Sequence, residues 1–213
     1  MIGKIRKGRS FGGCIRYVTQ KDDAEIIASE GVLLGTAEET ARSFRWQCLL
    51  SPDVAKPVGH IALSFKPEDA PRLTDAFMAR LAEEYLELMG IRNTQFIVVR
   101  HHGTDNPHCH IVFNRVDFDG KVISDSNDFR RNERVTKMLK KKYSLTYSEG
   151  KQSVKTEKLH ASERVKYEIY RAVKEALRSA DTWKEFQNRL LKMGVEMEFK
   201  YKGSTNEVQG IRF

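Results

Sequence analysis

The sequence predicts an α+β fold: a central antiparallel β-sheet flanked by helices in residues 1–148, and a mostly helical segment ending in strands in residues 149–213. Two observations carry this prediction. At least three short stretches alternate apolar and polar residues, as strands with one buried face do. In the longer stretches between them, apolar residues recur at helical spacing. Predicted strands and long helices therefore alternate along the chain.

The first half of the chain shows clear helix signals. Thr36 and Glu39 form the Thr-x-x-Glu pattern of a capping box. Phe77 and Leu81 lie at helical spacing, and Gly90 supplies the left-handed residue that ends such helices. In chain order we expect a strand within 1–8, helices to about residue 20 and over 36–50, a strand over 59–65 and a helix over 71–89.

The second half begins with a hairpin and ends in helices. Asp119-Gly120 is a hairpin turn signal, and Asp128 and Asp181 stand where helix caps are needed. The terminal strand-like residues 210–213 suggest a piece of a longer protein. We expect strands over 95–100 and 108–117, a basic helix over 128–143, a polar stretch over 144–158, and helices over 165–177 and 181–194.

Composition narrows the functional classes. The 213 residues, 40% of them hydrophobic, suffice for one full core, and the net charge of +8 favours a polyanionic partner, either nucleic acid or an acidic membrane surface. Cys14, Cys48 and Cys109 are too few and too scattered for a disulfide framework or a cysteine zinc site. Without an apolar leader or a spanning stretch, we expect a soluble cytoplasmic protein with no membrane insertion.

Histidines gather in one short region. Four of the six, including His101 and His102, lie within ten residues. On a strand His108 and His110 would share one face, with Cys109 on the other, and an antiparallel return would bring His101 beside them. Three nitrogen ligands leave coordination positions open, as a catalytic metal site requires. The alternative is a group of polar histidines without a metal.

Side chains beyond these three ligands can support the metal. Asp105, in the loop between the two strands, is a candidate for a further ligand or for an acceptor that fixes an imidazole tautomer. Asn114, at the end of the second strand, is a candidate for the same outer shell.

A metal on a basic protein favours phosphodiester chemistry, which also needs a nucleophile. Tyr17 lies on the expected first helix, beside Arg16 and near Lys21. Attack by a tyrosine would leave a phosphotyrosyl intermediate that can be reversed. Taken alone, Tyr17 fits an ordinary half-buried tyrosine better than a nucleophile.

A basic helix and scattered aromatic residues suggest contacts with single-stranded DNA. Phe11, Phe129 and Tyr147 are candidates for base stacking, and the alternative is a solvated helix face with core aromatic residues. The basic candidates on the helix are Arg130, Arg131, Arg134, Lys137, Lys140, Lys141 and Lys142.

Residues 101–114, His-His-Gly-Thr-Asp-Asn-Pro-His-Cys-His-Ile-Val-Phe-Asn, resemble the metal motif of the relaxase and mobilisation nuclease family, part of the HUH endonucleases. Residues 16–19, Arg-Tyr-Val-Thr, resemble the family's N-terminal tyrosine motif, and residues 60–65, His-Ile-Ala-Leu-Ser-Phe, its middle motif. The three occur in the expected order and spacing. Position 103 departs from the pattern, because glycine stands where many relatives have an acidic residue.

The resemblance implies a sheet that carries His101, His108 and His110, a Mg²⁺ or Mn²⁺ ion (with Zn²⁺ as an alternative), and Tyr17 as the nucleophile. It implies a DNA relaxase of a plasmid or integrative element that nicks one strand at a transfer origin. The products would be a 5′-phosphotyrosyl intermediate and, on reversal, a rejoined strand. Expected partners are single-stranded DNA, accessory mobilisation proteins and a coupling protein in the bacterial cytoplasm.

Two rival interpretations remain. A replication initiator or transposase of the same superfamily would use a tyrosine after the histidine motif, where Tyr143 and Tyr147 stand. A non-catalytic DNA-binding module would keep the metal for structure alone. That module would need a fourth strong ligand, and His102 and Cys109 are poorly placed to supply one.

Overall fold

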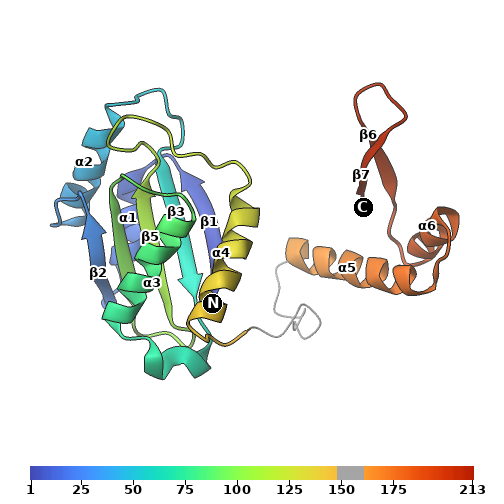
Figure 1. Ribbon diagram of the computed structural model, residues 1–213, viewed down its shortest axis with the longest axis horizontal. Coiled ribbons are helices and arrows are strands. Elements are labelled where there is room, and N and C mark those ends of the chain that lie inside the picture. The colour runs from blue at the N-terminus through green and yellow to red at the C-terminus, as the bar shows by residue number, and fades with distance from the viewer. Residues whose placement is uncertain (148–160) are drawn as a thin grey trace. The chain divides into compact units, whose positions relative to one another are not determined.

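Five antiparallel strands form the central sheet of the computed structural model, which describes residues 1–147 and 161–213. The strand order is β1-β3-β5-β4-β2, so the two strands that carry the histidine motif, β5 and β4, lie inside the sheet (Figure 1). The α+β prediction is confirmed. The strands are β1 (Ile2–Gly8), β2 (Ala24–Glu30), β3 (Val58–Ser64), β4 (Phe96–His101) and β5 (His108–Asn114).

The edge strand β2 has no counterpart among the predicted elements. It pairs with β4, but its register shifts between Ile26 and Ala28. The bulge breaks the simple alternation of faces, so the adjacent Ile26 and Ile27 are both only partly buried. A sequence pattern of period two therefore does not reveal this strand.

Helices cover both faces of the sheet. On one face, α1 (Phe11–Thr19) and α2 (Ala37–Cys48) bury Ile15 and Phe44 against Val99 and Val112. On the other, α3 (Asp75–Leu88) and α4 (Asp128–Lys142) pack on β3, β4 and β5 (Figure 1). Because residues alternate along a strand, His108 and His110 lie on the α1 face, and Cys109 lies in the core under α3 and α4, as predicted.

Helix starts agree with the predictions in one case and differ in three. Thr36 and Glu39 form the predicted capping box of α2. The helix predicted from residue 71 is split: η1, a 3-10 helix (Pro67–Arg72), precedes α3, which begins after its cap Thr74. Asp128 and Asp181 are not caps. Asn127, with φ of 53°, precedes α4, and Thr182 caps α6 (Trp183–Lys192) by accepting from Glu185 N.

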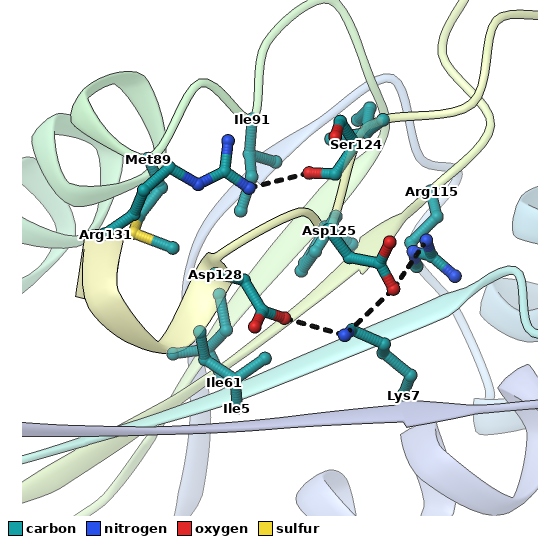
Figure 2. Close-up of a pocket in the computed structure, with 12 residues that line it drawn as sticks. Ile5, Lys7, Ile61, Met89, Ile91, Arg115, Ser124, Asp125, Asp128 and Arg131 are labelled. Carbon is teal, nitrogen blue, oxygen red and sulfur yellow. Dashed lines mark hydrogen bonds and ion pairs between the residues drawn. The ribbon is translucent and has the colours of Figure 1, made fainter. Parts of the chain in front are cut away.

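The carboxylate of Asp128 instead joins α4 to β1. Lys7 of β1 forms ion pairs with Asp128 at 2.7 Å and with Asp125 at 2.9 Å, and Arg115 reaches Asp125 at 3.2 Å (Figure 2). Apolar side chains such as Ile5 line the same pocket. Asp128 is buried, so the ion pair offsets the cost of removing its charge from water. This network fixes the start of α4 on the face opposite the histidines.

The chain divides into two compact units, Met1–Ser148 and Glu149–Phe213. In the second unit, Phe186 and Leu190 of α6 pack against Ala176. The predicted helices of this segment are confirmed, and most of the polar stretch predicted over 144–158 lies outside the described residues. Across 1–147 and 161–213, no helix has the length and hydrophobicity to span a bilayer. The other elements of the unit are α5 (Ala161–Ser179), β6 (Glu198–Tyr201) and β7 (Val208–Arg212).

Candidate metal centre and nucleophile

Pairing between β4 and β5 brings the predicted histidines together. His101, the last residue of β4, is the register partner of His108, the first residue of β5. His110 follows two positions along β5 on the same face. One ring nitrogen from each of the three histidines lies within 4.8 Å of the others. The hairpin return expected from the sequence therefore builds a three-nitrogen cluster that can hold a metal ion.

The remaining ring nitrogens of two of these histidines have backbone partners. His101 Nε2 lies 2.8 Å from Val18 O, and His108 Nδ1 lies 3.0 Å from Asn106 O and 3.1 Å from Thr104 Oγ1. A ring nitrogen that donates its proton to a carbonyl leaves the other nitrogen with a free lone pair. His101 Nδ1 and His108 Nε2, which lie 3.2 Å apart, are thereby the nitrogens that face a metal.

His60 on β3 completes this arrangement. Its Nε2 lies 3.0 Å from His110 Nδ1, so a proton on His110 Nδ1 can be donated to His60. His110 Nε2 is then the free nitrogen of the third ligand. Each of the three histidines thus has a partner that fixes its ring, as metal ligands require, and the donor set fits a divalent ion.

Burial favours the neutral form of His108 and His110 and of their neighbour His60. Burial, with repulsion from His60, His101 and His108, lowers the pKa of His110 to about 3. Burial also lowers the pKa of His60 and that of His108. Neutral imidazoles are the form that binds metals, so at neutral pH a metal does not have to displace protons from these rings.

Tyr17 stands beside the cluster. Helix α1 buries Phe11, Ile15 and Val18 against the sheet, which leaves the Tyr17 side chain 62% exposed at the edge of the helix. Its ring centre lies 5.9 Å from that of His110 and 6.0 Å from that of His60, both edge-on. The hydroxyl-bearing ring is therefore open to solvent and next to one of the three clustered histidines.

An open groove of about 360 Å³ runs past Tyr17 and His110 and is lined by Lys4 and Arg6 of β1. The sequence analysis missed these two residues as binding candidates. Their signal was the alternation of β1, in which Lys4 and Arg6 are exposed while Ile5 packs on the opposite face against the core.

The predicted basic residues fall into two groups. Arg16 is exposed on α1 beside Tyr17, and the charge of Lys21 acts on His108 and His110. The other group lies on α4, across the sheet from the histidines. Several of its side chains already have partners. Lys137 pairs with Glu133, Lys142 with Glu84, Arg131 donates to Ser124 O, and Lys140 is buried.

The predicted stacking residues are not equivalent. Phe11 is buried and stacks on Phe44 of α2, so it belongs to the core and the stacking prediction for it is wrong. Phe129 is exposed at the start of α4, and Tyr147 is exposed with Lys140 over its ring.

The two residues expected in the outer shell do not join the cluster. Asn114 is fully buried at the far end of β5, where its amide donates to Phe44 O and Gln95 and accepts from Val116 N. Its role is to tie α2 to the sheet, so the expectation of a metal role is wrong. Asp105 is exposed in the loop and belongs to neither of the two groups of the described residues that could hold a metal, which are the three histidines and the more exposed set of Glu25, Asp75 and His102.

The alternative tyrosines lie on the other side of the sheet. Tyr143 donates from its hydroxyl to Glu84 of α3 and packs edge-on against Phe77.

His102 was expected to point away from the histidine cluster, and it does so. Its ring pairs with Glu25 at 3.0 Å.

Adding Mn²⁺ should raise the melting temperature of the protein by several degrees when the ion is about 100-fold above its dissociation constant. His108→Ala removes one of the three nitrogens and should abolish the shift. His102→Ala removes a neighbouring imidazole that belongs to the separate group of Glu25, Asp75 and His102, and should keep the shift. Differential scanning calorimetry measures all three proteins. Equal shifts in both variants would contradict the proposed ligand set.

The metal-free protein should lose stability as the pH falls from 7 to 5. An unfolded histidine binds a proton near pH 6.5, whereas the folded-state pKa is about 3 for His110 and is lowered for His60 and His108. Unfolding therefore takes up protons below pH 6.5, and the free energy of unfolding should fall by about 1 to 3 kcal/mol. Urea denaturation at pH 7, 6 and 5 tests this. His110→Gln should flatten the dependence, and a wild-type stability independent of pH would refute it.

Comparison with known proteins gives one family. No curated protein matches the chain. The sequence model of the relaxase family, described as MobA/VirD2-like, nuclease domain, matches residues 17–145. This range begins at Tyr17 and includes His60 and all three clustered histidines. Because the match covers more than half of the chain, the protein belongs to the MobA/VirD2-like relaxase family.

Proposed function

We propose that this protein is a DNA relaxase in which Tyr17 cuts one DNA strand at a transfer origin and stays bonded to the new 5′ end. The observation that carries the proposal is the position of Tyr17, whose ring centre lies 5.9 Å from that of His110, at the edge of the three-histidine cluster. Membership of the relaxase family supports a DNA substrate. The proposal places the protein in the bacterial cytoplasm, with accessory mobilisation proteins and a coupling protein as partners.

The reaction exchanges one phosphodiester bond for another. The Tyr17 oxygen loses its proton to water in the open groove and forms a bond to phosphorus. The bond from phosphorus to the 3′ oxygen breaks, and that oxygen takes up a proton to become a free 3′-hydroxyl. Attack of a 3′-hydroxyl on the phosphotyrosine reverses every step, so the same site can rejoin the strand.

His101, His108 and His110 would hold a divalent ion, Mg²⁺ or Mn²⁺ being our choice and Zn²⁺ the alternative. When bound, the ion polarises the scissile phosphate and offsets the charge that develops on its oxygens. His60 keeps the His110 ring oriented through the 3.0 Å contact between their nitrogens. The lowered pKa values of His108 and His110 keep these two ligands free of protons at neutral pH.

The DNA strand is held, in this proposal, by the basic residues on the histidine face. Lys4 and Arg6 line the groove beside Tyr17, and Arg16 and Lys21 flank the same helix. The residues of α4 lie across the sheet and would contact only DNA that continues beyond the site.

Two observations weigh against the rival functions. A replication initiator using Tyr143 would need a hydroxyl near the histidines, but that hydroxyl bonds to Glu84 of α3 on the other face. A structural metal site would need a fourth strong ligand, but Cys109 is buried in the opposite core and His102 pairs with Glu25.

Tyr17→Phe should bind Mn²⁺ and single-stranded DNA normally but give no protein-linked product, because only the nucleophilic oxygen is lost. Tyr143→Phe and Tyr147→Phe are the matched controls and should cleave nearly normally. The measurement is a denaturing gel of labelled transfer-origin strands, followed by peptide mapping of the adduct. A DNA-linked peptide that contains Tyr143 or Tyr147 would favour the replication-initiator function.

Neutralising the groove should weaken DNA binding more than neutralising α4. The double variant Lys4→Gln/Arg6→Gln should reduce the slope of log affinity against log salt by about 1 to 1.5, the effect of losing two phosphate contacts on a single strand. Arg134→Gln/Lys141→Gln removes the same charges from exposed positions of α4 and is the control. Fluorescence anisotropy at several salt concentrations measures both, and a larger loss in the α4 variant would contradict the proposed path.

A further inference from the structure

Asp23, in the segment between α1 and β2, is joined to the loop that leads from His101 to His108. Its carboxylate Oδ2 accepts a hydrogen bond from Gly103 N at 2.6 Å, and its backbone oxygen accepts one from His102 N at 3.1 Å. These bonds continue the pairing of β2 with β4, in which Ala24 is the register partner of His101. Asp23 therefore lies beside position 103 although 80 residues separate them.

The Asp23 carboxylate lies where a side chain at position 103 would begin. A Cβ atom at position 103 would lie 2.5 Å from Asp23 Oδ2, closer than such atoms approach one another. Gly103 does not have the positive φ that favours glycine. A larger residue at position 103 would therefore require the Asp23 carboxylate to move.

The carboxylate is charged and acts on the histidine cluster. The hydrogen bond from Gly103, helped by the charge of Lys21, lowers the pKa of Asp23. Asp23 directly precedes Ala24, the register partner of His101, so this negative charge lies at the end of β4 that carries the first clustered histidine. A negative charge there would favour a divalent cation bound between His101 and His108.

The loop links this carboxylate to a ligand. Thr104 follows Gly103, and its hydroxyl donates to Asn106 O at 2.9 Å and lies 3.1 Å from His108 Nδ1. Asn106 O also lies 3.0 Å from the same nitrogen of His108. Asp23 holds the start of this loop, and the loop orients the His108 ring.

We propose that Asp23 is the acidic positioning residue of the metal site and takes the place of the side chain that position 103 lacks. It acts outside the three histidine ligands, by holding the 102–107 loop and by placing a negative charge next to His101 and His108. This inference rests on the metal-binding part of the proposed function and not on the identity of the nucleophile.

Titration of the full chain with Mn²⁺, followed by isothermal calorimetry, tests the proposal without DNA. Asp23→Asn keeps an acceptor for Gly103 N but removes the charge, and should weaken Mn²⁺ binding about 10-fold, as loss of such outer groups does. Asp22→Asn removes the same charge from the exposed neighbouring position and should bind Mn²⁺ as the wild type does. Equal affinities of the two variants would overturn the proposal.

Moving the acid gives a second, independent test. Gly103→Asp alone should weaken Mn²⁺ binding, because its Cβ overlaps the Asp23 carboxylate. Combined with Asp23→Ala, the same change should recover at least part of the affinity lost in Asp23→Ala. Melting of the metal-free variants checks that each one folds. A double variant no better than Asp23→Ala would count against the proposal, and Asp23→Asn decides the matter if Gly103→Asp does not fold.

The failure of this inference is distinguishable from the failure of the proposed function. If the wild type binds Mn²⁺ no better than His108→Ala, the metal site and the inference fall together. If the wild type binds Mn²⁺ and Asp23→Asn binds it equally well, the inference alone is wrong. Loss of the Tyr17 adduct with the Asp23 effect intact would overturn the nucleophile and leave the inference standing.

Discussion

The register between β4 and β5 is the constraint on which the rest of the site depends. Pairing of His101 with His108 places two imidazoles opposite each other, and the two-residue period of β5 adds His110 on the same face. A slip of one residue would turn His108 and His110 into the core and bring Cys109 to the surface. The buried Cys109, Ile111 and Val98 under α3 resist that slip, so the hydrophobic core of one face fixes the histidines of the other.

The two faces of the sheet also differ in what they do. On the α3 and α4 face, the core and the Lys7 to Asp128 ion pair hold the helices in place. On the α1 face, α1 covers only part of the strands, which leaves Lys4 and Arg6 bare beside Tyr17. The residues that stabilise the fold are therefore largely different from those that line the open groove. The basic helix α4 contributes to the fold, while the groove beside Tyr17 stays open.

Local patterns predicted local features well. The Thr36 capping box and the shared face of His108 and His110 depend on residues at most a few positions apart, and both were predicted. Features that depend on distant partners were not. Strand β2 was not predicted because its bulge breaks the alternating pattern. Asp128 was expected to cap α4, but it forms an ion pair with Lys7 of β1. Asn114 was assigned to the metal site, but its amide donates to Phe44 O of α2. In each case the deciding partner lies on another element of the fold.

Asp23, the acidic residue that we propose for the metal site, shows the same limit most clearly. A search along the sequence for a substitute for Gly103 finds Asp105, two positions on. In a hairpin loop, however, neighbouring side chains do not share a direction, and Asp105 is exposed. In a sheet the nearest neighbours of a residue lie across the strands, and the partner of His101 is Ala24, next to Asp23. In our proposal, the acidic side chain that position 103 lacks is therefore supplied by Asp23, next to the adjacent strand β2. The space left at Gly103 is filled by the carboxylate that the β2 to β4 pairing brings there.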